Sequence, residues 1–138
     1  MRLAHAMIRV DDLEESVAFY TGFLGLREVR RHELGDEATL AFLTDDAGHY
    51  HLELTFNKDG RRYEIGDRFG HLAFVVDDLD AVIEAIEARG WSMRESRPGN
   101  PSRYVFIKDP NGLDIEILQA RTPWTGKRVL ARGASDPA

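Results

Sequence analysis

Residues 5–13 read HAMIRVDDL, and residues 71–79 read HLAFVVDDL. Each stretch has a histidine, four further residues and then Val-Asp-Asp-Leu. Apolar residues occupy every second position in both copies, which predicts a strand that begins at the histidine and buries the opposite face. Because the two copies are separated by nearly half the chain, the sequence predicts an internal repeat of two equivalent modules.

A helix is expected after each of these strands, because apolar residues then recur at the spacing of one helical face. These positions are Leu13, Val17, Tyr20 and Leu24 in the first copy, and Leu79, Val82, Ile83 and Ile86 in the second. Asp12, followed by Glu15, resembles a capping box, and Asp78 occupies the equivalent position. Gly25 and Gly90 are suited to end the two helices.

The second part of each copy predicts a strand, a turn and another strand. Residues 41–54 read AFLTDDAGHYHLEL and residues 105–118 read VFIKDPNGLDIEIL, in which DPNG is a strong turn signal. We therefore predict an α+β fold of two tandem βαβββ modules that form a cupped, barrel-like mixed sheet with the helices outside. The expected single domain, residues 1–138, comprises module 1 (about 1–58), a polar link (59–69), module 2 (about 70–120) and a C-terminal arm (121–138).

The composition fits one globular domain and argues against several classes of function. The 138 residues are 43% hydrophobic, and the net charge of −6 gives no support for binding nucleic acid. With no cysteine, the chain has no disulfide, no thiolate metal site and no cysteine nucleophile. We expect a cytoplasmic protein without a membrane partner, because no apolar run approaches the length of a membrane span, about 18 residues, and no signal region precedes the first strand.

One histidine and one glutamate recur at equivalent polar positions of the repeat, namely His5 with Glu53 and His71 with Glu116. If the modules are related by a pseudo-twofold axis, all four side chains point into one cup. Two imidazoles and two carboxylates suit a divalent first-row metal ion, and the lack of sulfur disfavours a structural zinc site. The other three histidines are interpreted as surface residues: His32, His49 and His51, the last on the same face as Glu53.

With these motifs the chain resembles members of the vicinal oxygen chelate superfamily and, within it, the glyoxalase I family of lactoylglutathione lyases. The resemblance extends from residue 1 to about residue 119 and rests on MRLAHAMIRVDDLEESVAFYTGFLGL, LELTFN, YEIGDRFGHLAFVVDDL and FIKDPNGLDIEIL. In that family these motifs carry a His/Glu/His/Glu metal set, which matches His5, Glu53, His71 and Glu116. The short chain is similar to the bacterial forms activated by nickel or cobalt, so one such ion per site is expected, with zinc, iron or manganese as further options.

The resemblance implies a lyase that detoxifies methylglyoxal. Its substrate is the hemithioacetal of a 2-oxoaldehyde and a small thiol, which is isomerised to an S-2-hydroxyacyl thiol. By this resemblance Glu116 is expected to be the principal base, with Glu53 able to move a proton on the opposite face. Members of this family commonly form homodimers whose cups take ligands from two chains. The sequence leaves open whether each site here is built from one chain or from two.

The resemblance also suggests residues that bind the thiol. Arg9 and Asn57 match positions that bind glutathione in the family, and Arg68 lies near another such position. Several positions depart from the family pattern. Asn57 is followed by Lys-Asp-Gly instead of Trp-Gly, and Leu113 stands where the DPDGY motif has tyrosine. A lysine- and glycine-rich loop is replaced by RPGNPSRY (residues 97–104), in which Arg97 or Arg103 is a candidate to replace the lysine. These departures leave the identity of the thiol open.

Two other functions fit the same fold. One is a different metalloenzyme, such as an iron-dependent dioxygenase or a thiol transferase; a dioxygenase would use three of the four protein ligands. The other is a small-molecule-binding or resistance protein, which needs no metal ion and gives no reason for all four ligands to be present.

Overall fold

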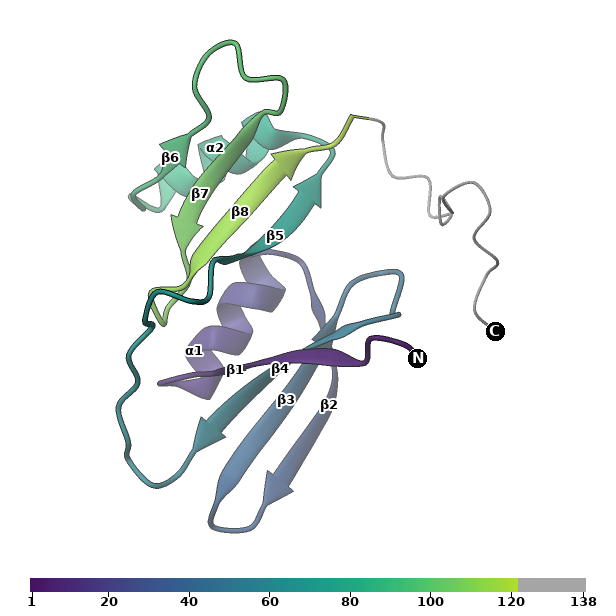
Figure 1. Cartoon of the computed structure of the whole chain (residues 1–138), viewed down its shortest axis with the longest axis vertical. Coiled ribbons are helices and arrows are strands. Elements are labelled where there is room, and N and C mark those ends of the chain that lie inside the picture. Colours follow the sequence, from purple (N-terminus) through teal and green to yellow (C-terminus); the bar gives the residue numbers. More distant parts are fainter. Residues whose placement is uncertain (122–138) are drawn as a thin grey trace.

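The computed structural model describes residues 1–121 and shows two modules, one above the other in Figure 1. The first contains β1 (His5–Arg9), α1 (Leu13–Ala18), a π-helical turn η1 (Phe19–Phe23), β2 (Arg27–Leu34), β3 (Ala38–Thr44) and β4 (His51–Asn57). The second contains β5 (His71–Val76), α2 (Leu79–Ala88), β6 (Arg94–Glu95), β7 (Tyr104–Lys108) and β8 (Asp114–Gln119). Residues 122–138, which make up nearly all of the expected C-terminal arm, lie outside the described residues.

Each module forms its own four-stranded mixed sheet, in the order β1-β4-β3-β2 and β5-β8-β7-β6. The first strand of each module pairs in parallel with the last, and the remaining pairs are antiparallel. The predicted α+β class and the two βαβββ modules are confirmed. Within one chain, however, the two described sheets remain separate, so the barrel-like sheet is not closed. The strands at the sheet edges are β1, β2, β5 and β6.

A helix covers one face of each sheet because that face is apolar. In module 1 the strand residues Ile8, Leu43 and Leu54 are buried toward α1, and in module 2 Ile115 and Ile117 are buried toward α2. Both predicted N-caps are confirmed, since the carboxylate of Asp12 accepts a hydrogen bond from Glu15 N and that of Asp78 accepts one from Ala81 N. The opposite face of each sheet is thereby left open.

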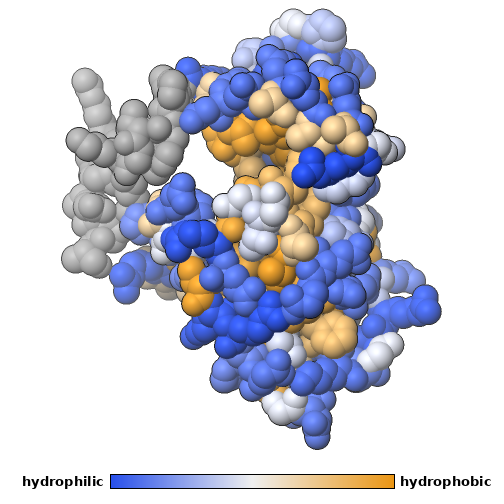
Figure 2. Space-filling view, turned by 180° about the vertical axis from the view of Figure 1, so that it is seen from behind, coloured by the Kyte–Doolittle hydropathy of each residue, from blue (hydrophilic) through white to orange (hydrophobic). Residues whose placement is uncertain are grey.

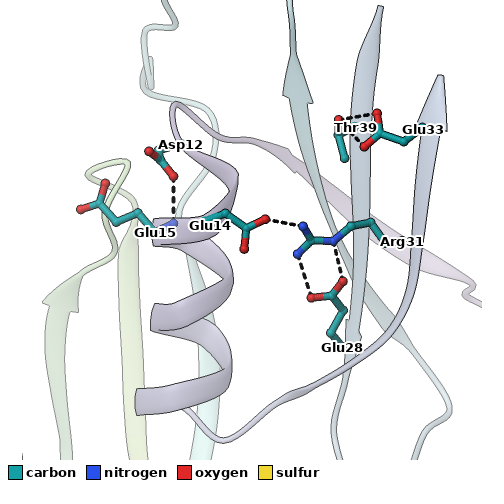
Figure 3. A network of polar contacts seen from close by, with 7 residues as sticks. All are labelled: Asp12, Glu14, Glu15, Glu28, Arg31, Glu33 and Thr39. Atoms are coloured by element: carbon teal, nitrogen blue, oxygen red, sulfur yellow. Dashed lines mark hydrogen bonds and ion pairs between the residues drawn. The ribbon is translucent and has the colours of Figure 1, made fainter. Parts of the chain in front are cut away.

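Ion pairs on the outside hold α1 against β2. The guanidinium of Arg31 donates to both carboxylate oxygens of Glu28, at 2.7 and 3.0 Å, and also contacts Glu14 on the helix (Figure 3). These bonds raise the pKa of Arg31, chiefly through the hydrogen bonds to Glu28 and Glu14. Farther along β2, Glu33 accepts from Thr39 on β3. The edge strand β2 is therefore tied to both of its neighbours.

The first helix changes from α to π geometry at Phe19. The sequence pattern from Leu13 to Leu24 predicted one continuous helix, and its α-helical part ends earlier than expected. Gly25 and Gly90 end the helical segments as predicted, with φ angles of 77° and 68°, a region that favours glycine.

The π-helical turn η1 contacts the second module. Phe19 and Phe23 lie against Trp91, with ring centroids 5.7 and 4.9 Å apart. Next to them the hydroxyl of Tyr20 donates a 2.7 Å hydrogen bond to the buried carboxylate of Asp109, in the DPNG turn. The two modules therefore contact each other through the helical side of module 1 rather than through their open sheet faces.

No helix within residues 1–121 is both long enough and apolar enough to cross a membrane.

Candidate metal site and active site

The parallel pairing of β1 with β4 brings His5 next to Glu53. His5 Nε2 lies 3.0 Å from Glu53 Oε2, with 45% of the histidine side chain and 12% of the glutamate side chain exposed. Both side chains lie on the face of the sheet that points away from α1, which we call the cup face. The sequence dictates this placement because Leu52 and Leu54, on either side of Glu53, are buried in the core.

Module 2 repeats this arrangement. The pairing of β5 with β8 places His71 Nε2 3.0 Å from Glu116 Oε2, with 41% and 16% of the two side chains exposed. Ile115 and Ile117 are buried on the other face, as Leu52 and Leu54 are in module 1. The predicted equivalence of the two His–Glu pairs is thus present in the geometry as well as in the sequence.

The structure brings the four predicted ligands together as two pairs and not as one group. Among residues 1–121 of a single chain, no three His, Asp or Glu side chains gather closely enough to hold a metal ion. The separation within each pair is compatible with two ligands of one ion. Two ligand atoms about 2.1 Å from one ion and at right angles to each other lie about 3 Å apart. The donor set therefore fits a divalent ion, with each module offering one imidazole and one carboxylate.

A row of further side chains crosses each cup face. In module 1 the register pairs Glu53 with Phe42 and Phe42 with Arg30. His5 packs edge-on to the Phe42 ring at 5.9 Å, and Arg30 Cζ lies 4.1 Å from the centre of the same ring. The row therefore runs from the His–Glu pair over an aromatic ring to a guanidinium on the outermost strand.

The same row is present in module 2. Glu116 pairs with Phe106, which pairs with Arg94. His71 packs edge-on to the Phe106 ring at 5.1 Å, and Arg94 Cζ lies 4.9 Å from its centre. Sequence reasoning missed these four residues, although the aligned strands AFLTDD and VFIKDP already place Phe42 opposite Phe106.

The residues expected to bind the thiol lie at the ends of β1 and β4 and in the link. Arg9 is exposed at the end of β1, on the cup face, four residues after His5. Asn57 ends β4, and its side-chain amide donates a 2.6 Å hydrogen bond to the hydroxyl of Tyr63 in the link. Arg68 is exposed in the same link. Of these three, Asn57 has a structural partner that fixes the path of the link.

The two arginines considered as replacements for the family's lysine differ in their surroundings. The guanidinium of Arg103 forms an ion pair with Asp80 of α2 at 2.5 Å. This contact raises the pKa of Arg103 and lowers that of Asp80, in each case chiefly through their hydrogen bond. Arg97 is exposed in the loop between β6 and β7. Arg103 is thus engaged with α2, on the side of the sheet away from the cup face.

An apolar cavity of about 830 Å³ lies between the modules. Its lining includes Leu72, Phe74 and Val76 of β5, together with Leu24 and Leu26 after the first helix. In Figure 2 apolar surface gathers in the hollow between the two halves of the molecule. The edge strand β5 is therefore flanked by apolar surface.

Comparison with known proteins agrees with this geometry. Residues 2–117 match the Glyoxalase/Bleomycin resistance protein/Dioxygenase superfamily. A probable lactoylglutathione lyase of Vibrio parahaemolyticus is 39% identical over 131 residues, which cover 91% of this chain and 95% of the relative. A lactoylglutathione lyase of Haemophilus influenzae is 38% identical over 132 residues, which cover 91% of this chain and 98% of the relative.

Solved structures give the same result. The trypanothione-dependent glyoxalase I of Leishmania major superposes with a TM-score of 0.74 at 31% identity, covering 86% of each chain. Glyoxalase I of Zea mays superposes with a TM-score of 0.76 at 30% identity, covering 86% of this chain and 44% of that chain. The chain therefore belongs to the Glyoxalase/Bleomycin resistance protein/Dioxygenase superfamily, and within it is a lyase of the glyoxalase I type.

Proposed function

We propose that the chain isomerises the hemithioacetal of methylglyoxal and a small thiol to an S-2-hydroxyacyl thiol. The observation that carries the proposal is the recurrence of a His–Glu pair, at the same 3.0 Å separation, at equivalent positions of both modules. The relatives named as lactoylglutathione lyases support the choice of reaction. We further propose that the reaction takes place in the cytoplasm.

The proposed metal ligands are His5, Glu53, His71 and Glu116, which together hold one divalent ion. When bound, this ion supplies a Lewis acid that stabilises the negative charge developing on the substrate oxygens. Nickel and cobalt are the first choices, because the chain is similar to short bacterial forms; zinc, iron and manganese are the alternatives to be tested.

Glu116 is the proposed base. It takes a proton from one carbon of the hemithioacetal and returns it to the neighbouring carbon, which requires one carboxylate within hydrogen-bonding reach of both positions. The surroundings of the two glutamates support this assignment. Glu53 is held at both oxygens, by His5 and by the hydroxyl of Thr55 at 3.0 Å. Glu116 contacts His71 through Oε2, and within residues 1–121 its Oε1 has no partner.

We propose that two chains build each site. In one chain the two pairs are separate, and the modules contact each other away from their cup faces. A second copy can complete the ligand set by placing its module 2 beside module 1 of the first. The unpaired edge strands β1 and β5 and the apolar surface beside β5 suit such a homodimer.

Thioester formation by metal-stripped protein tests the reaction. Nickel, cobalt, zinc, iron or manganese is added back in turn, with methylglyoxal and glutathione as substrates. We expect metal-dependent turnover that falls by about a hundredfold to ten-thousandfold in Glu116→Gln, while calorimetry shows that this variant still binds the metal. If no metal ion supports thioester formation although one of them binds, the proposed substrate is wrong. Since one relative is described as trypanothione-dependent, other thiols are then compared in the same assay.

Mixing two inactive variants tests the shared site. One chain carries His5→Gln with Glu53→Gln, and the other carries His71→Gln with Glu116→Gln. If each site combines module 1 of one chain with module 2 of the other, a mixed dimer contains one intact site and one doubly damaged site, and activity returns on mixing. If every site is built within one chain, the mixture remains inactive. Each variant refolded alone serves as the control.

A further inference from the structure

The repeat of the two modules breaks on the cup face at the position two residues beyond each glutamate. In module 1 this position is Thr55, and in module 2 the equivalent residue of β8 is Leu118. Each side chain lies on the same face of its sheet as the neighbouring glutamate, because alternate residues of a strand share a face. The two His–Glu pairs share a 3.0 Å separation, but only the first has a hydroxyl beside its carboxylate.

The hydroxyl of Thr55 is directed at the carboxylate of Glu53. It donates a 3.0 Å hydrogen bond to Glu53 Oε1, while Glu53 Oε2 lies 3.0 Å from His5 Nε2. Thr55 is 7% exposed, so the bond is shielded from water. A carboxylate that is held at both oxygens cannot turn about its last side-chain bond without losing a contact. The protein therefore fixes the orientation of Glu53 before a ligand binds.

Glu116 lacks this support. Its Oε2 lies 3.0 Å from His71 Nε2, and within residues 1–121 no hydrogen bond to its Oε1 is present. The aliphatic side chain of Leu118 has no donor to offer. Rotation of the Glu116 carboxylate therefore breaks one contact, whereas rotation of the Glu53 carboxylate breaks two.

We propose that Thr55 is a positioning residue that keeps Glu53 as a fixed ligand of the proposed site and leaves proton transfer to Glu116. This inference rests on the proposed function, in which the two glutamates occupy equivalent positions of the repeat. A glutamate that acts as the base has to turn toward the carbon that carries the proton. Thr55 opposes this movement in module 1, and Leu118 cannot oppose it in module 2. One hydroxyl thus gives different tasks to two equivalent carboxylates.

Binding of nickel to the full chain tests the positioning role independently of turnover. Thr55→Val removes the hydroxyl and nearly preserves the shape of the side chain. Groups that hold a metal ligand in place typically contribute a factor of about 10 to 100 in metal affinity, so titration calorimetry should show a loss in this range. The visible absorption spectrum of the cobalt-loaded chain should also shift, because it depends on ligand geometry. Thr55→Ser, which keeps a hydroxyl, should retain most of the affinity and the original spectrum.

Thr39→Val is the matched control. Thr39 is also 7% exposed, and its hydroxyl also donates to a glutamate, Glu33. Its strand partner is Phe56, which packs against the core, so Thr39 lies on the face of β3 away from the cup. This substitution should leave the nickel affinity and the cobalt spectrum unchanged. Equal losses in Thr39→Val and Thr55→Val would overturn the inference, because the effect would then be a general loss of packing.

Exchange of the two side chains tests the assignment of tasks. In the unmodified chain Glu116→Gln should lower kcat by about a hundredfold to ten-thousandfold. In the Thr55→Val/Leu118→Thr background the same substitution should lower kcat by about tenfold or less, because Glu53 is then free to transfer the proton. Leu118→Thr alone should raise the nickel affinity by about tenfold and lower kcat, with little change in KM, because it restrains Glu116.

The possible outcomes separate this inference from the proposed function. An unchanged nickel affinity and cobalt spectrum in Thr55→Val would overturn the inference and leave the proposed reaction unaffected. The inference is also wrong if Glu116→Gln lowers kcat equally in the exchanged background and in the unmodified chain. If the unmodified chain binds nickel but forms no thioester, the proposed function is wrong, and the calorimetry still decides whether Thr55 positions Glu53. If Thr55→Val does not fold, Leu118→Thr decides, and an unchanged nickel affinity in that variant would overturn the inference.

Discussion

The hydroxyl of Tyr20 in η1 donates a 2.7 Å hydrogen bond to the carboxylate of Asp109, which belongs to the other module. Tyr20 is fully buried and Asp109 is 5% exposed. The same carboxylate accepts hydrogen bonds from the backbone N–H groups of Asn111 and Leu113, so it also shapes the DPNG turn. One buried carboxylate thus joins the two modules and fixes the turn that precedes β8.

Replacing Tyr20 by phenylalanine should lower the free energy of unfolding by about 2 kcal/mol. The ring is kept, and the loss comes from removing a hydrogen bond to a buried charged acceptor. Urea denaturation followed by circular dichroism measures the change. Thr21→Val serves as a control, because Thr21 donates only to the carbonyl of Val17 within its own helical segment. Equal stability of Tyr20→Phe and the unmodified chain would show that the contact between modules contributes little.

Stability at alkaline pH should depend on the same tyrosine. Burial, reinforced by the charge and the hydrogen bond of Asp109, raises the pKa of Tyr20 far above its ordinary value of 10.0. Below the pKa of tyrosine in the unfolded chain, the hydroxyl is protonated in both states and stability is unaffected. Above that pKa only the unfolded chain releases the proton, so the free energy of unfolding falls as the pH rises. Between pH 8 and 11 the unmodified chain should lose about 1.4 kcal/mol more than Tyr20→Phe. Parallel pH dependence of the two proteins would contradict this.

Addition of nickel should stabilise the protein, and chelation should reverse the effect. At a free concentration one hundred times Kd, a ligand that binds only the folded state adds about 2.7 kcal/mol. Thermal unfolding with nickel and with excess chelator measures the difference. His5→Gln and His71→Gln should each remove most of it, whereas His49→Gln, in the loop before β4, should retain it. Stabilisation that survives both ligand substitutions would place the ion elsewhere.

Helix caps should contribute equally in both modules. Asp12→Ala and Asp78→Ala each remove an acceptor for a backbone N–H in the first turn of a helix, at 2.9 and 3.0 Å. Each substitution is expected to cost about 1 kcal/mol in chemical denaturation. Asp12→Asn, which retains a capping oxygen, should restore most of that loss. A cost confined to one module would show that the two halves unfold separately.

Core truncation should have a larger effect than removal of a helix cap. Leu54 is fully buried between Glu53 and Thr55, on the side of β4 that faces α1. Leu54→Ala should lower the free energy of unfolding by about 2–5 kcal/mol through lost burial and a residual cavity. The His–Glu pair lies on the other face, so variants that remain folded should still bind nickel. Loss of nickel binding in folded Leu54→Ala would show that the core also positions Glu53.

The repeat explains why so much of this fold was predictable from the sequence. Alternating apolar residues specify which side of a strand faces the core, and that places His5 and Glu53 on the same face without further information. Their separation could not be predicted in the same way, since it depends on the parallel pairing of β1 with β4. The predicted caps and stops are local features, and the structure confirms them.

Features that depend on contacts between modules could not be predicted. The change to π geometry at Phe19 cannot be detected from the spacing of apolar residues, which is evaluated for an α-helix of 3.6 residues per turn. The partnership of Tyr20 with Asp109 joins residues far apart in the sequence, and each looked like an ordinary helix or turn residue. For the same reason the sequence could not show that the two His–Glu pairs of one chain remain apart, because that depends on how whole modules pack.

The parallel pairing of the first and last strands of each module also determines when a ligand pair forms during folding. His5 can meet Glu53 only after nearly all of module 1 has been synthesised and its sheet has assembled around β4. Such long-range pairings form slowly, because the intervening chain must be ordered first. The same holds for His71 and Glu116. Each His–Glu pair therefore forms only when the sheet of its own module is complete, and in the proposed site the metal ion can be held by all four ligands only after both modules have folded.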